Sequence, residues 1–380
     1  MINIPEILVA NCSGAAMVIL LFLFRVRTKE KMRIGERLYE NMLLTTLVAL
    51  TAETISFLID GKSFHGCRFL VYLTNTLCTA LTLHVALIWC LFVDYRTNGS
   101  MERLKKKARW IGLIYALVLV ALMINLSGNG IAFSVSHDNR YARGPVNIGV
   151  SALLFALYGE SVATAARARR GKLYAVFFPV YFFIVPCLSG TLLQLCFYGL
   201  ATGWLSVAMA FVFVNLQMQH YNSFIDEMTG LFNRKYLVHC LRRVHRKGMR
   251  VGGIMLDAND FKRINDEHGH LAGDQALRQI GAILQRSVPE EAVAIRISGD
   301  EYVVLLADGT DEVIAETERR IEENVRRFNQ TAKEPYELSL SMGGAQYNGT
   351  GIESFFAAMD RAMYAAKKEY YLTHEKGGAK

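Results

Sequence analysis

The stretch "AVAIRISGDEYVVLLA" (residues 292–307) decides the fold of the C-terminal part of the chain. Two apolar runs flank a short polar turn that contains Gly299, which predicts a β-hairpin. The turn carries two adjacent carboxylates, Asp300 and Glu301. Acidic residues at a hairpin tip are commonly solvated turn residues. The hairpin alone therefore leaves a structural and a catalytic interpretation open.

Expected strands and helices alternate around this hairpin. A strand is expected over 251–256, a helix over 273–287, a charged helix over 311–328, a strand over 336–345 and a last helix over 352–369. This order predicts an α+β domain in which helices cover one face of a sheet.

Polar residues beside the first expected strand indicate phosphate chemistry. Asp257 ends this strand, so Asp257, Asp300 and Glu301 would converge if the first strand and the hairpin are neighbours. Carboxylates at such a point suit Mg²⁺, which is usually held by one or two carboxylates and by substrate phosphates. Gly299 would let a ligand approach the backbone closely, and Lys262 could neutralise a phosphate. The pattern favours metal-assisted phosphoryl or nucleotidyl transfer.

Five motifs, in order, resemble those of the GGDEF-type diguanylate cyclases. They are "DEMTGLFNR" (226–234), "LDANDFKRINDEHGHLAGD" (256–274), "RISGDEY" (296–302), "SMGGA" (341–345) and "DRAMYAAK" (360–367). The resemblance runs from Asp226 to about Lys368. It implies a palm-like, ferredoxin-related nucleotide cyclase domain that condenses two GTP molecules into cyclic di-GMP and releases pyrophosphate.

The resemblance also implies roles for individual residues. Asp257, the Ala258 carbonyl, Asp300 and Glu301 would hold two Mg²⁺ or Mn²⁺ ions per active site, with Asp300 and Glu301 as the catalytic residues. Glu301 would either ligate the second metal or act as the base for the 3′-hydroxyl. The expected substrate-binding residues are Asn265 and Asp274 at the guanine, Phe261, Lys262 and Lys367 at the β- and γ-phosphates, and Gly299 at the hairpin tip. Each domain would hold one GTP, so catalysis requires a homodimer.

Four positions depart from the family pattern. Ser298 replaces the first glycine of the signature, Tyr302 replaces a phenylalanine, and Tyr371 stands where an arginine is frequent. "PEEA" (289–292) stands in place of the product-inhibition motif, so no feedback inhibition is expected there. The retained carboxylates favour an enzyme. Ser298 and Tyr371 leave a catalytically inactive, GTP-binding signalling module as the alternative.

The N-terminal half contains long apolar runs. Seven of them approach the length that crosses a bilayer, namely 6–24, 41–59, 68–93, 110–127, 146–165, 174–197 and 200–218. They predict an α-helical transmembrane bundle, with a seven-helix sensor domain over 1–213, a helical signalling linker over 214–226 and the cyclase domain over 227–380. Trp89, Trp110 and Trp204 fall near expected helix ends, as an interfacial aromatic belt requires.

Basic residues predict the orientation of this bundle. Loops 25–40, 94–109 and 166–173 hold 16 Lys and Arg against five acidic residues, and such loops are cytoplasmic. The N-terminus would then lie outside and the cyclase domain inside, in the inner (cytoplasmic) membrane of a bacterium. The net charge of +8 therefore reports contact with the lipid bilayer rather than with nucleic acid.

Three ionisable residues fall within the expected spans, namely Glu53, His84 and Glu160. Residues of this kind usually face the bundle interior. His84 and Glu160 lie at similar depths, so they are expected either to form a contact or ligand pocket or to make interhelical hydrogen bonds without a ligand. The sensed signal, a small molecule or the membrane itself, is not specified. A transporter with an appended regulatory domain is a weaker alternative, because no inverted repeat is evident.

Apolar residues recur at heptad spacing after the last expected span. They are Val214, Met218, Tyr221, Ile225 and Met228. Two heptads are too few to establish a coiled coil. The pattern fits either a signalling helix that pairs in a dimer or a helix whose apolar side rests on lipid or on its own domain.

Overall fold

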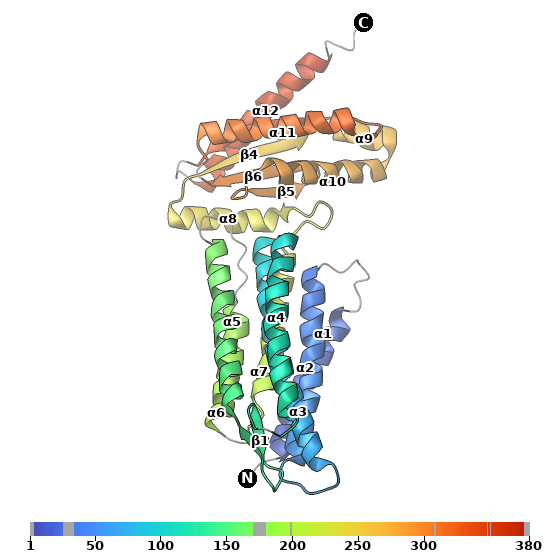
Figure 1. Ribbon diagram of the computed structural model, residues 1–380. Coiled ribbons are helices and arrows are strands. Elements are labelled where there is room, and N and C mark those ends of the chain that lie inside the picture. Colours follow the sequence, from blue (N-terminus) through green and yellow to red (C-terminus); the bar gives the residue numbers. More distant parts are fainter. Residues whose placement is uncertain are drawn as a thin grey trace. The chain divides into compact units, whose positions relative to one another are not determined.

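The computed structural model describes residues 4–25, 34–128, 130–169, 180–197, 200–307, 309–347, 349 and 351–375. Within these residues the chain forms two compact units. The N-terminal unit is helical and extends to Gln219, and the C-terminal unit contains a five-stranded sheet and begins at His220. Figure 1 labels the elements of both units.

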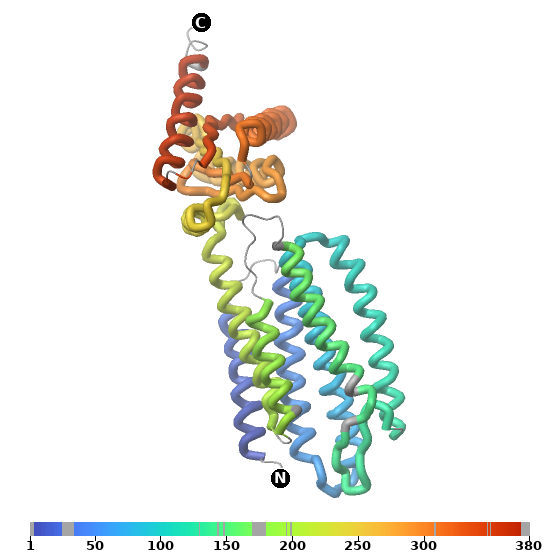
Figure 2. The backbone as a smooth tube through the Cα atoms, turned by 90° about the vertical axis from the view of Figure 1, so that its left-hand side faces the viewer, coloured from blue at the N-terminus to red at the C-terminus, as the bar shows by residue number. Residues whose placement is uncertain are grey.

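The N-terminal unit is a bundle of helices that lie alongside one another (Figure 2). They are α1 (Ile4–Arg25), α2 (Ile34–Ile59), α3 (Cys67–Asn98), α4 (Met101–Asn125), α5 (Pro145–Arg169), α6 (Tyr181–Cys196) and α7 (Gly203–Asn222). A short antiparallel hairpin, β1 (Phe133–Val135) and β2 (Tyr141–Arg143), lies between α4 and α5.

Five helices in the described part of the chain, α1 to α5, are long and apolar enough to cross a membrane. The prediction of seven spans is not confirmed. The expected span 174–197 lies partly outside the described residues, and α6 has 16 residues. Helix α7 has 20 residues, but Asn215, Gln217 and Gln219 make its last turns polar.

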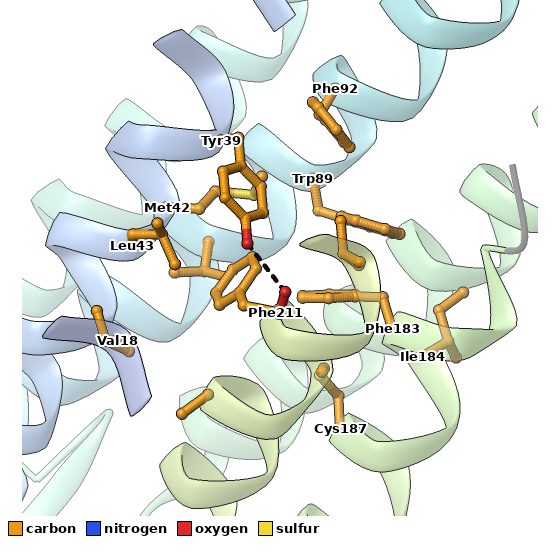
Figure 3. Close-up of a cluster of buried hydrophobic side chains, with 14 of the residues drawn as sticks. Val18, Tyr39, Met42, Leu43, Trp89, Phe92, Phe183, Ile184, Cys187 and Phe211 are labelled. Carbon is orange, nitrogen blue, oxygen red and sulfur yellow. Dashed lines mark hydrogen bonds between the residues drawn. The ribbon is translucent and has the colours of Figure 1, made fainter. Parts of the chain in front are cut away.

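Aromatic side chains fill the centre of the bundle (Figure 3). The Tyr39 hydroxyl donates a hydrogen bond to the Phe211 carbonyl at 2.9 Å, which joins α2 to α7. The Trp89 ring stacks on Phe183 with 3.9 Å between ring centroids, which joins α3 to α6. Trp89 is completely buried and Trp204 nearly so. The expectation that these two tryptophans mark a membrane interface is therefore wrong, because they pack in the core.

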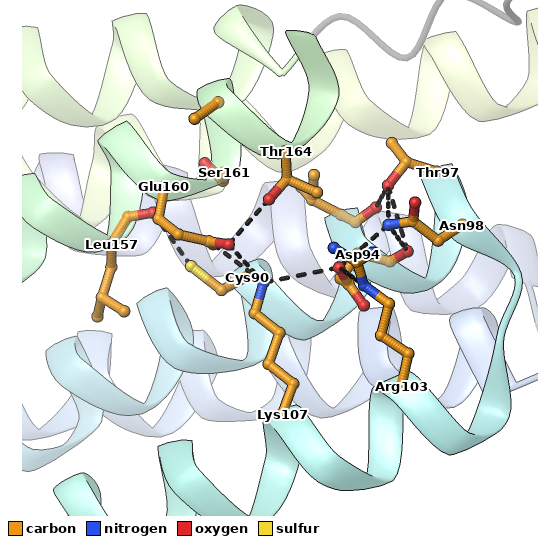
Figure 4. Close-up of polar contacts among 12 residues, drawn as sticks. Cys90, Asp94, Thr97, Asn98, Arg103, Lys107, Leu157, Glu160, Ser161 and Thr164 are labelled. Carbon is orange, nitrogen blue, oxygen red and sulfur yellow. Dashed lines mark hydrogen bonds and ion pairs between the residues drawn. The ribbon is translucent and has the colours of Figure 1, made fainter. Parts of the chain in front are cut away.

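The polar residues of the bundle pair differently from the expectation. The His84 Nε2 atom lies 2.8 Å from Asn41 Oδ1. Glu160 instead accepts two hydrogen bonds from Lys107 Nζ, at 2.9 and 3.0 Å (Figure 4). The predicted pairing of His84 with Glu160 is wrong, because Lys107 on α4 supplies the compensating charge. Glu53 accepts a hydrogen bond from Gln194 at 3.1 Å.

The C-terminal unit has an α+β fold with a mixed sheet of strand order β3-β5-β6-β4-β7. The strands are β3 (Phe232–Asn233), β4 (Val251–Ala258), β5 (Val293–Ser298), β6 (Glu301–Ala307) and β7 (Leu340–Gln346). The helices are α8 (Arg234–Lys247), α9 (Phe261–His268), α10 (His270–Ser287), α11 (Asp311–Thr331) and α12 (Ile352–Glu375). Strands β5 and β6 form the predicted hairpin, and β4 lies between β6 and β7.

Helices cover both faces of this sheet. Ile254 and Val304 face a cluster with α9, α10 and α11, whereas Met255 and Val303 face a cluster with α8 and α12. The prediction that helices cover one face is wrong. All eight residues of β4 are buried, and a strand buried on both sides needs cover on both sides.

The helix that leads from the N-terminal unit to the C-terminal unit ends earlier than expected. Helix α7 ends at Asn222, before the predicted end of the linker at residue 226. Met218 is buried in the cluster of the N-terminal unit, whereas Ile225 forms a β-bridge with Phe232 and Met228 packs in the C-terminal unit. The heptad pattern therefore does not describe one continuous helix.

Two further differences concern the C-terminal unit. Strand β7 begins at Leu340, four residues after the predicted start, because the side chain of Asn329 hydrogen-bonds both backbone groups of Leu338. Helices α8 and α9 and strand β3 were not expected. Asn233 caps α8 by accepting hydrogen bonds from the backbone N–H groups of Lys235 and Tyr236, as N-cap asparagines do.

Candidate active site

The C-terminal end of β4 lies against the hairpin tip. In the ladder Asp257 is directly opposite Glu301, and the Ala258 N–H donates to the Asp300 carbonyl at 3.2 Å. The structure thus brings together the four residues expected to hold metal ions. Their positions follow from the antiparallel register of β4 and β6.

Lys367 reaches this cluster from α12. Its Nζ atom donates to Asp257 Oδ1 at 2.6 Å. Asp257 is buried, with 7% of its surface exposed. Burial acts to lower the pKa of Lys367, but the hydrogen bond and the negative charge of Asp257, together with Asp300, outweigh it and raise this pKa above its ordinary value. The ammonium group is therefore held in its charged form.

Asp300 lies where its ionised form is disfavoured. Burial is the main cause that raises its pKa, and the negative charges of Asp257 and Glu301 add to it. Asp257 and Asp300 thus share the Lys367 ammonium, and Glu301 adds a third negative charge beside Asp300. Among the described residues no group of three or more His, Cys, Asp or Glu forms a ready metal cage. The donor set nevertheless fits Mg²⁺, which completes its coordination with waters and phosphate oxygens.

The loop between β4 and α9 is held from two sides. The buried side chain of Asn259 accepts a hydrogen bond from Ser341 at 2.7 Å and donates one to Ser339 at 2.9 Å. Asp260 adopts a left-handed backbone conformation with φ of 54°, and its Oδ2 atom accepts a hydrogen bond from the Tyr370 hydroxyl at 3.0 Å. Sequence reasoning missed Asn259 and Tyr370, because their partners lie about 80 and 110 residues away.

Helix α9 follows this loop and starts with the expected phosphate-binding residues. Phe261 packs against the core, and Lys262 is exposed in the first turn. The first N–H groups of a helix have no intrahelical partner, and such groups favour phosphate. Phe261 and Lys262 thus lie where a phosphate chain could reach them.

Asn265 and Asp274 lie at the junction of α9 and α10. The Asn265 side chain lies against Gly273, where a Cβ atom would collide with it. Asp274 is the next residue of α10. The two expected guanine-binding residues therefore lie near each other along the chain fold.

The departures at the hairpin have distinct structural consequences. Tyr302 is buried, and its hydroxyl donates to the Leu277 carbonyl at 3.3 Å, so this substitution is accommodated. The Ser298 hydroxyl donates to Glu301 Oε2 at 2.9 Å. Gly299 has a positive φ of 46° and open space around the position of a Cβ atom.

Arg296 is a site residue that sequence reasoning missed. Its Nε atom donates to the Gly299 carbonyl at 2.9 Å, and its Nη1 atom lies 3.2 Å from Asp226 Oδ1. Asp226 also accepts hydrogen bonds from the backbone N–H and the hydroxyl of Thr229. Arg296 therefore ties the hairpin tip to the start of the unit. The sequence signals were that Arg296 and Asp226 each open one of the five motifs.

A polar groove of about 840 Å³ lies between α9, α11 and the segment before β7. Asp260 and Tyr370 line it, but none of the expected metal ligands does. The groove is therefore separate from the carboxylate cluster, although it borders the same loop.

Comparisons with known proteins find similarity to diguanylate cyclases over part of the chain. Residues 223–371 match the family described as "Diguanylate cyclase, GGDEF domain". The diguanylate cyclase DosC of Escherichia coli (strain K12) is 31% identical over 151 residues, which are 38% of this chain and 33% of that protein. The diguanylate cyclase DgcS of Shewanella oneidensis is 33% identical over 149 residues, 37% and 49% of the two chains.

A solved structure of a sensory box/GGDEF family protein from Caulobacter crescentus is 32% identical, with a TM-score of 0.33, and the match covers 38% of this chain and 99% of that one. The chain spans between a third and a half of the length of the two curated relatives. Residues 223–371, which are less than half of the chain, match the model of the GGDEF domain of diguanylate cyclases.

Proposed function

We propose that the chain is a membrane-bound diguanylate cyclase that condenses two GTP molecules into cyclic di-GMP and two pyrophosphates. One observation carries this proposal. Asp257, Asp300 and Glu301 meet at one end of β4, beside Lys367, inside a domain that matches the GGDEF family. This is the arrangement that nucleotidyl transfer requires, with oxygen ligands for metal ions next to a cation for phosphate.

Some of the site residues would bind metal ions and others would bind the nucleotide. The carboxylates of Asp257, Asp300 and Glu301 and the Ala258 carbonyl would hold two Mg²⁺ or Mn²⁺ ions, which stabilise charge on the attacking and leaving oxygens when bound. Glu301 faces the hairpin tip, where it would ligate the second ion or take the proton of the 3′-hydroxyl. With metal on Asp257, Lys367 would be released to pair with a phosphate.

The nucleotide itself would be held by three groups of residues. Phe261 and Lys262, at the start of α9, and Lys367 would hold the β- and γ-phosphates, and Gly299 would let the ligand approach the hairpin. Asn265 and Asp274 would read the guanine. A carboxylate is a suitable acceptor for the N1–H and the N2 amine of guanine.

Each GGDEF domain would hold one GTP, so the active enzyme would be a homodimer. In that dimer each 3′-hydroxyl attacks the α-phosphate of the other GTP, and pyrophosphate leaves. The site lies at a strand end and hairpin tip of the C-terminal unit, and a second copy of that unit would complete it. We expect no product inhibition through "PEEA" (289–292), because it offers carboxylates in place of the arginine that would bind a phosphate.

The N-terminal unit would act as the sensor in the inner membrane of a bacterium. An odd number of spans, whether five or seven, places the N-terminus and the cyclase domain on opposite sides. The basic loops 25–40, 94–109 and 166–173 favour the cytoplasm for the cyclase side. The domains would then be a sensor over 1–213, a linker over 214–226 and the cyclase over 227–380, gated by a small molecule or by the membrane.

A second candidate function is a GTP-binding signalling module without turnover. The hydrogen bond from Ser298 to Glu301 favours it, because it engages a carboxylate that catalysis needs. Tyr371 also stands where an arginine contact to phosphate is expected.

One experiment separates the two candidates. The full-length chain is reconstituted in nanodiscs with GTP and Mg²⁺, and the product is identified by mass beside an Asp300→Ala variant. Cyclic di-GMP from the unchanged chain alone supports the enzyme. If no product forms although GTP binds, residues 214–380 are fused to a dimeric coiled coil. If the forced dimer also forms no cyclic di-GMP, the cyclase function is ruled out and the GTP-binding signalling module remains.

A further inference from the structure

The positive charge of the C-terminal unit is concentrated at one helix. Residues 234–250 contain seven basic residues and no acidic residue. The seven are Arg234, Lys235, Arg242, Arg243, Arg246, Lys247 and Arg250. Residues 220–380 as a whole hold 22 basic and 24 acidic residues. The rest of the unit is therefore strongly acidic, and α8 stands out from it.

Helix α8 directs this charge away from its own domain. Leu237, Cys240 and Val244 are buried against the sheet. Positions on the opposite side of the helix are exposed, including Arg242 and Arg246, one turn apart. Apolar Val238 lies among them and is 42% exposed. The helix thus presents a basic face, defined here as Lys235, Val238, His239, Arg242 and Arg246.

This basic face has no anionic partner within the described residues. None of the seven basic residues of 234–250 forms an ion pair there. The positive electrostatic potential of this face affects the pKa of His239. Burial lowers its pKa, and the charges of Arg243, Arg246 and Arg242 lower it further. An external anion on this face would relieve that repulsion.

With the N-terminal unit in a membrane as proposed, the short connection from α7 keeps this face within reach of lipid. Arg234 begins α8 only 12 residues after α7 ends at Asn222, and an extended segment of that length spans at most about 40 Å. Lipid phosphates are therefore present at high effective concentration, whereas a soluble polyanion has to arrive from solution. Polybasic segments next to membrane helices are attracted to anionic lipid.

We propose that the basic face of α8 binds the anionic headgroups of the leaflet beside which α7 ends. This inference rests on the proposed membrane placement of the N-terminal unit, but not on catalysis. Binding would fix the orientation of the GGDEF domain on the membrane and limit how two domains approach each other. Anionic lipid would then be a partner of the soluble domain as well as of the spans.

The test uses the full-length chain in two kinds of nanodisc, one of phosphatidylcholine alone and one that also contains phosphatidylglycerol. A photo-crosslinking amino acid replaces Val238, and lipid adducts are counted by mass spectrometry. The same group at Tyr364, which is exposed on α12, serves as the control position. We expect several-fold more phosphatidylglycerol adducts at 238 than at 364. We also expect a loss of adducts at 238 in phosphatidylcholine and at high salt, because the attraction is screened.

Matched charge reversals test the mechanism of binding. Arg242→Glu with Arg246→Glu should reduce the adducts at 238 several-fold. Arg286→Glu with Arg327→Glu makes the same change of charge at exposed positions of α10 and α11 and should leave the adducts unchanged. If the α8 variant does not fold, the comparison of the two lipid compositions in the unchanged chain still decides.

Several outcomes would overturn the proposal. These are equal adducts in both lipids, an equal loss in both double variants, crosslinks from 238 to protein, or displacement of lipid by a short added DNA duplex. Protein crosslinks or displacement by DNA would assign the face to that partner instead. Because the readout is a lipid adduct, it does not depend on GTP turnover. Its failure is therefore distinguishable from failure of the proposed cyclase activity.

Discussion

The Lys367 ammonium donates a hydrogen bond of 2.6 Å to the Asp257 carboxylate, across 110 residues of chain. In the proposed reaction Asp257 holds a metal ion and Lys367 holds a phosphate, so each residue has two alternative partners. Without metal, the ammonium is the hydrogen-bond partner of the buried carboxylate. Metal and nucleotide would then replace this pair together.

We expect Lys367→Met to lower kcat/KM for GTP by ~10²-fold, which is typical for loss of one charged group that stabilises a transition state. Lys368→Met is the matched control, because the Lys368 ammonium lies over the Tyr364 ring, 4.8 Å from its centre. Pyrophosphate release by the full-length chain measures both. Equal losses in the two variants would contradict a specific role for Lys367.

Ser298→Gly should lower the Mg²⁺ concentration that gives half-maximal turnover. The Ser298 hydroxyl donates to Glu301 Oε2, and this hydrogen bond competes with metal at that oxygen. A hydrogen bond contributes about 1 kcal/mol, which corresponds to roughly a five-fold change in affinity. A Mg²⁺ titration of turnover checks this, with Tyr302→Phe as the control that leaves the carboxylates untouched. A higher Mg²⁺ requirement in Ser298→Gly is the opposite of this expectation.

Tyr370→Phe should raise KM for GTP several-fold and change kcat little. The Tyr370 hydroxyl holds Asp260, whose left-handed backbone shapes the loop before α9. Loss of this contact loosens the phosphate-binding segment without removing a reacting group. Tyr364→Phe, on the same helix and exposed, is the control. Steady-state kinetics at varied GTP separates KM from kcat, and an unchanged KM would show that the loop does not need Tyr370.

Asp226→Asn should destabilise the C-terminal unit by about 1 kcal/mol at neutral pH. Burial opposes ionisation of Asp226, but hydrogen bonds from Thr229 and the charge of Arg296 outweigh it and hold its pKa below the ordinary value. A depressed carboxyl pKa contributes stability above the unfolded pKa of about 4, and this stability is lost as pH falls through the folded pKa.

The difference between the Asp226→Asn variant and the unchanged chain should therefore shrink below pH of about 4 and disappear once the pH is below the folded pKa of Asp226. Thermal unfolding of the C-terminal unit in the full-length chain measures it. Glu227→Gln, at an exposed neighbouring position, should have no effect at any pH. A difference that persists in acid would mean that geometry, rather than charge, carries the role of Asp226.

Lys107→Met should destabilise the N-terminal unit by roughly 2 kcal/mol, as expected for the loss of hydrogen bonds to a charged group. Lys107 contacts Glu160 at 2.9 Å and Asp94 at 3.8 Å. Asp94 keeps its ion pair with Arg103 at 3.1 Å, so Glu160 is the carboxylate that loses its nearest cation. Thermal unfolding in detergent tests this, with exposed Lys106→Met as the control. Glu160→Gln added to Lys107→Met should recover part of the loss.

The sequence predicted the hairpin and its surroundings well, because local patterns decide them. Alternation and one glycine were enough for β5 and β6, and β4 and α10 to α12 also lie close to the predicted ranges. Helix α8 was missed although Leu237, Leu241 and Val244 recur at helical spacing. Its many arginines and lysines masked an amphipathic pattern.

The remaining errors concern contacts between distant segments. The similar depths of His84 and Glu160 along their spans suggested a contact. Depth does not fix which side of a helix a residue is on, and Glu160 instead pairs with Lys107 of α4. The heptad spacing predicted a helix that continues beyond Asn222. The chain instead turns there, and the Asp226 carbonyl accepts a hydrogen bond from the Gly230 N–H. Residue spacing alone does not show such a turn. Arg296 and Tyr370 act on the site through partners that only the folded chain brings near.

The order of the strands has a consequence for biosynthesis. Asp257 is made 110 residues before Lys367, an interval of roughly 5–20 s at ordinary rates of translation. During that time the burial of β4 is incomplete, because β6, β7 and α12 are still to be made. The helices of the N-terminal unit have by then left the ribosome. A nascent chain that stalls before α12 would thus hold Asp257 without the counter-charge of Lys367, and the emergence of α12 supplies it.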